Sequence, residues 1–343
     1  MSYIGNVGDN DTVDTFQLKD GAVTAAKVAA DVATQAELDA VLPKAGGTMT
    51  GNIATAGITS VTLGTSNFVA GVNAGNSIVS GGNYNTVVGD EAGTAITTGD
   101  YNSASGYQTL KANTTGLRNV GVGANSLLSN TTGSYNTTVG VNSLNANTTA
   151  SNNTAVGYSA LNANTTGADN TALGVSSLAA NTTGIRNTAV GKAALAASTT
   201  GSYNAATGWY ALTANTTGAK NTSVGYAALS DNTTGGDNTA VGYNSLSNNT
   251  TGTLNTATGT QALYYNTTAS NNTASGYKAL FANTTGTGNV AVGKGALDAN
   301  TTANYNTAVG LDALGSNITG TNNNAFGETA LFSNTTGGNN QAI

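Results

Sequence analysis

Hydrophobic and polar positions repeat along most of this chain with a period of seventeen residues. The unit reads NTAVGYxALxxNTTGxx, and its first asparagine recurs without a slip from Asn85 to Asn340. Seventeen residues are too few for two packed helices but enough for short strands and turns, and a strict period is typical of coils stacked on one another. The pattern predicts a rod in which each coil contacts only its neighbours.

Three positions of the unit never vary in its fifteen complete copies. In the copy that begins at Asn153, they are Asn153, Gly157 and Thr166, at positions one, five and fourteen. The invariant glycine predicts a bend where a side chain would clash or where φ must be positive. Gly167, at position fifteen, is replaced by alanine in three copies, which indicates a close approach of chains rather than a left-handed conformation.

Two further positions are nearly invariant. Position nine is leucine (Leu161) except at Gly93, and position twelve is asparagine (Asn164) except at Ile96 and Ser198. Stacked coils place equivalent side chains about 4.8 Å apart. We therefore expect ladders in which each side chain bonds its copies above and below, and apolar columns. The ladder residues are Asn153, Asn164 and Thr166, and the columns contain Val156 and Leu161.

The expected core of one coil is thin. Each coil offers about one valine, one leucine and a few alanines, at roughly 1.5–3 kcal/mol per buried aliphatic side chain, against about 1–2 kcal/mol to order each residue. Small residues at positions three and eight (Ala155 and Ala160) indicate that another surface approaches closely. We therefore expect several chains side by side, most simply a homotrimer.

The chain before the repeats divides into three segments. Residues 1–23 are polar, and residues 24–43 carry apolar positions at helical spacing and end at Pro43, which predicts a short helix. Residues 44–84 alternate apolar residues with Gly and Asn, which predicts an irregular β transition into the repeats at 85–343.

Composition excludes several classes of protein. Charged residues make up 8% of the chain and there is no Cys or His, so we expect no thiolate or imidazole metal site, no cofactor and no disulfide. The repeats lack the basic stripe of a nucleic-acid-binding surface. No stretch approaches the roughly 20 apolar residues of a membrane span, and the first residues do not resemble a signal peptide.

The repeat resembles a known group of fibrous proteins. The unit NTAVGYSALNANTTG (Asn153–Gly167) resembles tandem repeats of phage and bacterial tail-fibre proteins, and a longer form of the NSVAIG-type repeat in the heads of trimeric autotransporter adhesins. That resemblance implies an all-β, trimeric parallel β-roll. LPKAGGTMTGNI (Leu42–Ile53) is similar to a frequent tail-fibre motif. FQLKDGAVTAAKVA (Phe16–Ala29) resembles the virion-attachment ends of marine phage fibres.

These features predict a structural tail-fibre shaft in the virion. It would bind virion tail proteins through its N-terminal segment and hold a host-recognition tip that lies past Ile343 or in a separate protein. The alternative is a bacterial trimeric surface adhesin or an extracellular filament, which the absence of a signal peptide disfavours.

Aromatic residues recur at position six of the unit. A column of them could stack on sugar rings of a host glycan, or could contact a host protein. The alternative is that they cover the apolar flank of the rod or fill grooves between chains. The residues are Tyr107, Tyr158, Trp209, Tyr226, Tyr243 and Tyr277.

Other chemistry is weakly supported by the sequence. Without His or Cys a hydrolase would need paired carboxylates, and Asp90 with Glu91 or Asp231 with Asp237 lie at variable positions, so we expect no enzyme. The NTT triplets match glycosylation acceptors, but ladders explain them equally well. Threonine ladders also occur in ice-binding solenoids, although Thr165 and Thr166 are adjacent and would point opposite ways in a strand.

Overall fold

The computed structural model describes residues 64–343, and within them every regular element is a short β-strand. The predicted attachment segment (1–23) and helix (24–43) lie outside the described residues. The strands are β1 (Phe68–Ala70), β2 (Thr86–Val88), β3 (Ser103–Ser105), β4 (Val120–Val122), β5 (Thr137–Val139), β6 (Thr154–Val156), β7 (Thr171–Leu173), β8 (Thr188–Val190), β9 (Ala205–Thr207), β10 (Thr222–Val224), β11 (Thr239–Val241), β12 (Thr256–Thr258), β13 (Thr273–Ser275), β14 (Val290–Val292), β15 (Thr307–Val309), β16 (Asn324–Phe326) and β17 (Gln341–Ala342).

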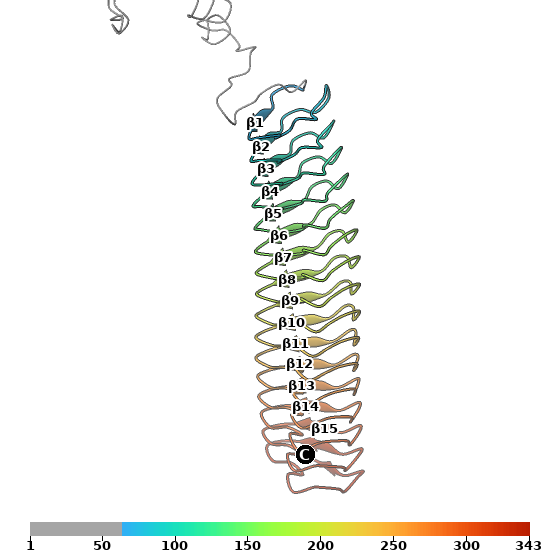
Figure 1. Ribbon diagram of the computed structural model, residues 1–343. Helices are drawn as coiled ribbons and strands as arrows, with labels where there is room; N and C mark the ends of the chain where they lie inside the picture. The colour runs from blue at the N-terminus through green and yellow to red at the C-terminus, as the bar shows by residue number, and fades with distance from the viewer. Residues whose placement is uncertain (1–63) are drawn as a thin grey trace, which may run out of the picture. The chain divides into compact units, whose positions relative to one another are not determined.

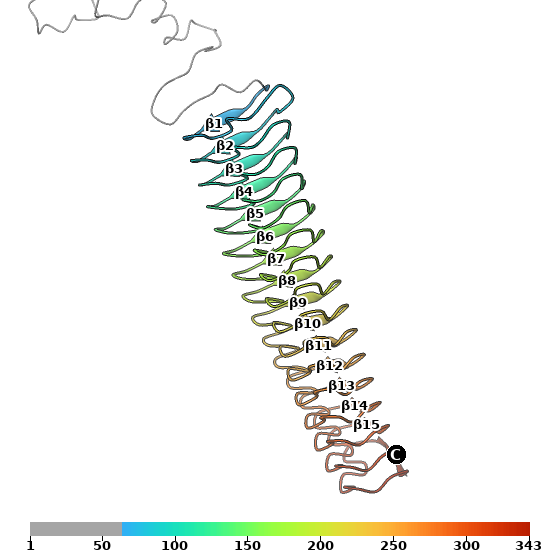
Figure 2. The same ribbon diagram turned by 45° about the vertical axis from the view of Figure 1, so that its right-hand side comes forward.

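All seventeen strands form one parallel sheet that runs along the rod (Figures 1 and 2). Each strand pairs with the next one in sequence, and from β2 onward the shift is seventeen residues, as in Thr154↔Thr171. The prediction of an all-β parallel solenoid with seventeen-residue coils is therefore confirmed. Sixteen steps of about 4.8 Å make this rod about 77 Å long.

The solenoid begins one coil earlier than the repeat pattern predicts. Phe68 of β1 pairs with Thr86 of β2, a shift of eighteen residues. The last part of the segment predicted as an irregular transition is thus a regular coil. The seventeen-residue pattern does not include this coil, because it has one extra residue and different core residues, such as Gly75 in place of leucine.

Alternation along each strand decides which side chains are inside. In β6, Ala155 is fully buried while Thr154 and Val156 face outward. Val156 therefore belongs to an outer column, which corrects its assignment to the interior. The reason is the two-residue period of a strand, which puts positions two and four on the face opposite to position three. The buried residues of this coil are Asn153, Ala155, Ala160, Leu161, Asn164 and Gly167.

Left-handed backbone conformations close each coil. Ser159, Leu161 and Asp169 have φ of 53°, 51° and 60°, and equivalent residues repeat these values along the rod. A left-handed residue other than glycine costs about 1–2 kcal/mol. Leu161 nevertheless adopts this conformation because it is fully buried, and burial of a leucine is worth about 1.5–3 kcal/mol.

The two repeat glycines have different roles. Gly157 has φ of 131°, and a Cβ on it would lie 2.5 Å from the carbonyl oxygen of Gly174 in the next coil. Gly167 has no left-handed φ, but a Cβ there would lie 2.3 Å from the oxygen of Gly184. Both predictions therefore agree with the structure. Position five requires glycine for its positive φ and for the close approach of the next coil, whereas position fifteen requires a small residue only for the close approach.

A continuous asparagine ladder runs through the interior at position one. The Oδ1 of Asn136 accepts a hydrogen bond of 3.0 Å from the backbone N–H of Asn153, whose side-chain amide donates to the Gly167 oxygen at 3.0 Å. Equivalent backbone bonds link every coil from Asn67 to Asn340. The buried amides are thus satisfied, and each one fixes the position of the next coil.

A second ladder lies at position twelve. The Asn164 amide donates to the Oδ1 of Asn147 at 3.1 Å, and equivalent bonds continue toward the C-terminal coils. Beside it, the hydroxyl of Thr165 donates to the backbone oxygen of Thr182 at 3.0 Å. Thr166 is exposed, which corrects the prediction for position fourteen: the threonine ladder is made at position thirteen.

The interior is closed within one chain. Ala155 and Ala160 are fully buried against the leucine column of their own solenoid. The small residues from which a neighbouring chain was expected therefore pack inside the coil, and their size reflects the narrow space between its walls.

Candidate interaction surface

The outward face of the sheet carries two parallel columns of small and β-branched side chains. Position two is mostly threonine, and position four is mostly valine, of which Val156 is 36% exposed. In residues 64–343 neither column contains a charged side chain. The exposed valines of position four form an extended apolar column, and extended apolar patches mark interaction sites.

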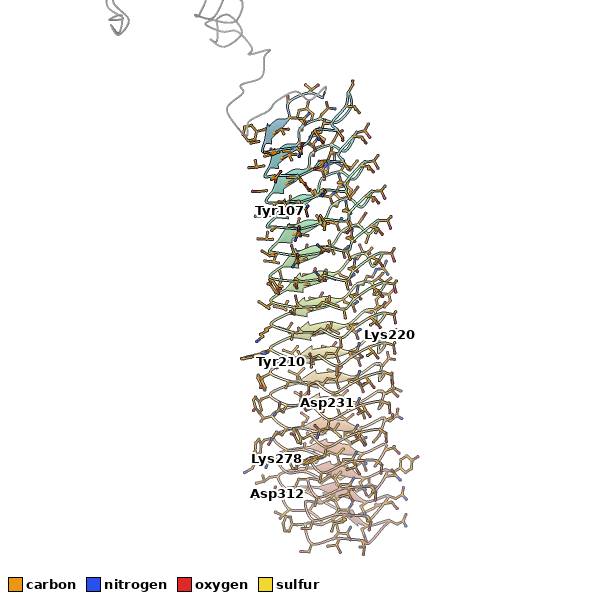
Figure 3. All side chains as sticks on the ribbon, in the orientation of Figure 1. Tyr107, Tyr210, Lys220, Asp231, Lys278 and Asp312 are labelled. Atoms are coloured by element: carbon orange, nitrogen blue, oxygen red, sulfur yellow. The ribbon has the colours of Figure 1, made fainter. Side chains whose placement is uncertain are left out.

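The predicted aromatic residues of position six lie at one edge of this face. All six are between 44% and 55% exposed. Figure 3 places Tyr107 on the same edge of the rod as Tyr210 and Lys278 of position seven, with Lys220 of position seventeen on the opposite edge. The structure thus aligns the six residues in one column, although small and charged residues interrupt it.

Part of the aromatic column covers itself. The Trp209 and Tyr226 rings meet edge to face with centroids 6.0 Å apart, and Tyr226 and Tyr243 stack at 5.3 Å with 12° between their planes. Lys192 Nζ lies 5.2 Å from the Trp209 ring. Among the described residues, Tyr107 and Tyr158 make no contact with another ring. Ring faces within the run from Trp209 to Tyr243 are therefore occupied by neighbouring coils.

A second aromatic column, at position seventeen, escaped the sequence analysis. Tyr84 and Tyr101 stack at 4.9 Å, and the Arg118 guanidinium lies between Tyr101 and Tyr135, at 5.4 and 5.5 Å from their ring centroids. Arg118 also donates to the Tyr135 hydroxyl at 2.7 Å. The same seventeen-residue spacing could have revealed it. Because its rings and cation face one another, this column links coils.

A third aromatic group lies at positions ten and eleven. Tyr264 and Phe281 stack with centroids 5.6 Å apart, and Tyr265 contacts both rings edge on. Lys278 Nζ is 4.8 Å from the centroid of Phe281 and 5.6 Å from that of Tyr277. This cluster concentrates aromatic side chains in the coils that follow Tyr243.

Charged side chains form small local groups. Lys111 and Gln108 bond the Glu91 carboxylate, and these hydrogen bonds lower the pKa of Glu91, while the same contact raises the pKa of Lys111. Burial raises the pKa of Asp298, and the nearby carboxylate of Asp312 adds to this effect. Within residues 64–343 no three acidic, His or Cys residues gather into a metal-binding group.

The asparagines of the NTT triplets are buried in the folded rod, except Asn334 in the last complete copy, which is partly exposed. Asn113, Asn130 and Asn164 are fully buried, and their side-chain amides donate to backbone or side-chain oxygens. The triplet is therefore explained by the ladders at positions twelve and thirteen.

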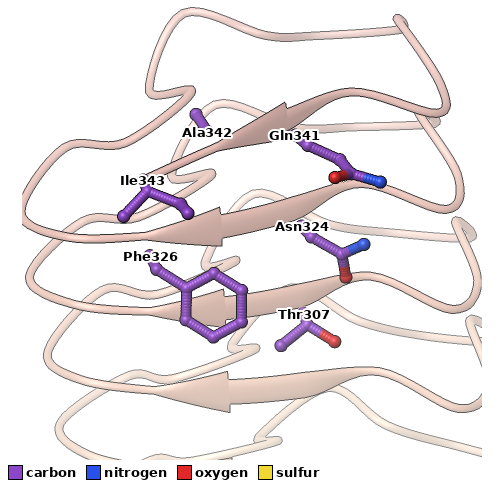
Figure 4. Close-up of a pocket in the computed structure, with 6 residues that line it drawn as sticks. All are labelled: Thr307, Asn324, Phe326, Gln341, Ala342 and Ile343. Carbon is purple, nitrogen blue, oxygen red and sulfur yellow. The ribbon is translucent and has the colours of Figure 1, made fainter.

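A surface hollow of about 620 Å³ lies on the outward face at the last strands (Figure 4). It extends from Thr307 of β15 past Asn324 and Phe326 of β16 to β17. No charged side chain lines it, so its side chains offer shape, amide groups and apolar contact. Its lining residues are Thr307, Asn324, Phe326, Gln341, Ala342 and Ile343.

Comparison of the chain with known protein families, curated proteins and solved structures gives no match. In the described part of the chain, no helix has the length and apolar character needed to cross a bilayer.

Proposed function

We propose that this protein is a structural fibre shaft, a rod that holds two other components at a fixed distance. The observation that carries the proposal is the unbroken asparagine ladder, which links every coil from Asn67 to Asn340. A rod needs stiffness along its whole length, and a buried hydrogen bond in each coil supplies it without a large core.

The mechanism is mechanical. Bending the rod would open coils on one side, which would break backbone and asparagine hydrogen bonds in a buried, low-dielectric interior, where an unsatisfied group costs about 1–3 kcal/mol. Because each coil repeats the same bonds, the number of coils sets the length.

The length of the rod tests this proposal. Deletion of residues 153–203 removes three coils and joins equivalent positions, so the rod should shorten by about 14 Å while remaining folded. Small-angle scattering and electron microscopy measure the length, and circular dichroism measures folding. Deletion of residues 153–194, which breaks the period, is the control and should disrupt the array. An unchanged length, or loss of structure in the in-period deletion, would contradict a modular rod.

The proposed shaft is a homotrimer whose chains meet through the threonine and valine columns. The uncharged face, about 77 Å long and about 10 Å wide, offers roughly 800 Å² per chain, which a trimer divides into two contacts of about 400 Å² each. The flanking columns at positions six and seventeen contain Tyr, Lys, Arg and Asp, which suits the polar rim of an interface.

Light scattering on the intact protein tests the trimer. A mass near three chains of 33.6 kDa is expected. Lysine at Val139, Val156 and Leu173 together should give single chains, whereas lysine at the exposed Thr149, Thr166 and Thr183 should not. A wild-type protein with the mass of one chain would sink the trimer and leave the single-chain rod intact.

The proposed setting is the tail of a phage, with residues 1–23 attached to virion tail proteins. The support is the resemblance of Phe16–Ala29 and Leu42–Ile53 to tail-fibre segments. The alternative is a bacterial surface adhesin or filament with the same rod. Gold-labelled antibody against the repeats, applied to purified virions and to cells of the source, decides between them: label on tails supports the first setting, and label on uninfected cells the second.

A further inference from the structure

We propose that Tyr243 and Tyr277 form the two walls of a slot that binds one pyranose ring of a surface polysaccharide. This inference extends the proposed shaft by giving it a lateral binding site. The two tyrosines occupy position six of coils that are separated by one coil, and the residue between them in the column is Thr260. Both rings are accessible, at 51% and 47% exposed.

The orientation of Tyr243 is fixed from one side. Its ring stacks on Tyr226 at a centroid distance of 5.3 Å and an angle of 12°. These rings belong to successive coils, so the planes stack along the rod axis. One face of Tyr243 is therefore covered by Tyr226, and the other faces the coil of Thr260, where no aromatic side chain stands in the column.

Hydrogen bonds between coils hold the two walls in register. The backbone N–H of Gln261 donates to the oxygen of Tyr243 at 2.9 Å, and that of Lys278 donates to the oxygen of Thr260 at 3.1 Å. The three coils are thus tied together directly beside the column. A pre-formed pair of walls lowers the entropic cost of binding.

The spacing selects the shape of the ligand. Two coil rises separate the two residues by about 10 Å. Two van der Waals contacts of about 3.5–4 Å account for about 7–8 Å of this distance. The remaining space accommodates the thickness of a puckered ring, whereas a planar ring would leave it empty. Adjacent rings at 5.3 Å, as in Tyr226 and Tyr243, leave no such space. The C–H groups on the faces of a pyranose chair suit contact with the electron-rich faces of tyrosine rings.

Polar side chains accompany the two tyrosines. Thr260 is exposed and lies between them in the column, and Gln261 and Lys278 follow Thr260 and Tyr277 directly in the chain. Lys278 Nζ lies over the Tyr277 ring, 5.6 Å from its centroid, so this wall carries a cation. The other aromatic residues of position six lack this arrangement: Tyr107 and Tyr158 have no tyrosine two coils away.

The test uses the full chain and an array of purified bacterial O-polysaccharides and capsular polysaccharides. The wild type should bind at least one of them, and the affinity for that polysaccharide is then measured by calorimetry. Tyr243→Ala and Tyr277→Ala should each weaken binding at least tenfold. Thr260→Tyr adds an aromatic ring but fills the slot, and it should weaken binding to a similar extent. Tyr158→Ala is the matched control and should bind as the wild type does.

Several results would overturn the slot. They are no binding of the wild type to any polysaccharide, wild-type affinity in Thr260→Tyr, or an equal loss in Tyr158→Ala. Melting curves by circular dichroism verify that each variant is folded, and scattering verifies the rod length. Loss of binding with an unchanged rod leaves the proposed shaft in place, so the two proposals fail independently.

Discussion

Ile96 packs into the space beside Gly93 that the leucine of position nine occupies in later coils. Gly93 stands at the leucine position, and a Cβ on it would lie 2.8 Å from the Cδ1 of Ile96, which is fully buried. Gly75 and Ile78 repeat this arrangement in the preceding coil, where the corresponding distance is 3.1 Å. Glycine at position nine and isoleucine at position twelve therefore occur together, in place of leucine and asparagine. The asparagine ladder at position twelve begins in the next coil, at Asn113.

This coupling predicts non-additive effects on stability. Gly93→Leu should lower the free energy of unfolding by about 1–3 kcal/mol through overpacking against Ile96. Backbone strain adds little, because leucine adopts the same φ, near 52°, in the other coils. Ile96→Asn should cost about 2–5 kcal/mol because it empties the core. The double variant restores leucine and asparagine at these positions. Its loss of stability should be smaller, by about 0.5–3 kcal/mol, than the sum of the losses in the two single variants. Urea unfolding of the four proteins measures the coupling, and strict additivity would contradict it.

Ser198 interrupts the position-twelve ladder and should be a site of easy stabilisation. Ser198 Oγ and Asn181 Oδ1 are both buried and lack a hydrogen-bond partner. Ser198→Asn should supply a donor to Asn181 and raise stability by about 1–3 kcal/mol. Thermal unfolding measures the change. The reverse exchange in the next coil, Asn215→Ser, should lower the melting temperature, and a decrease in Ser198→Asn would show that the gap serves another purpose.

Adjacent threonines should respond differently to loss of their hydroxyl groups. Thr165→Val removes the hydrogen bond to the Thr182 oxygen and should cost about 0.5–1.5 kcal/mol. Thr166→Val changes an exposed side chain and should have an effect within about 0.5 kcal/mol. Chemical unfolding of the two variants compares them directly. Equal losses would mean that position fourteen also holds the coils together.

Asp298 should make stability depend on pH. Its pKa in the folded rod is raised by burial and by Asp312, so the folded state binds the proton more tightly than the unfolded state does. Stability contributed by this proton is fully present below the ordinary carboxyl pKa of 3.8 and is lost as the pH rises through the folded-state pKa. Asp298→Asn should therefore melt at a higher temperature than the wild type at pH 7.

The advantage of Asp298→Asn should disappear near pH 3, where the wild-type carboxyl is protonated in both states. Melting curves from pH 3 to pH 7 record it. Asp237→Asn, at an exposed site, is the matched control and should show a smaller difference. A constant difference between Asp298→Asn and the wild type across this range would contradict the assignment.

Periodicity made much of the fold predictable. The recurrence of Asn153 and its copies gave the coil length, the parallel stacking and the asparagine ladders, because a strict repeat without insertions allows each residue to contact its own copy. The roles of the two glycines were also predictable from the repeat, because alanine replaces glycine at position fifteen in some copies but never at position five. These properties depend on comparison of the chain with itself, which a single sequence permits.

The sequence by itself thus determined the solenoid, its period and its hydrogen-bonded interior. Only the tertiary structure decided which side of the wall each column faces: Val156 and Thr166 outside, Ala155 and Thr165 toward neighbouring coils or the core. It also decided that one chain closes its own interior, and that Tyr226 covers one face of the Tyr243 ring. The physical reason is that a repeat fixes the distance between copies, whereas the direction of each side chain depends on where the left-handed residues turn the backbone within the coil.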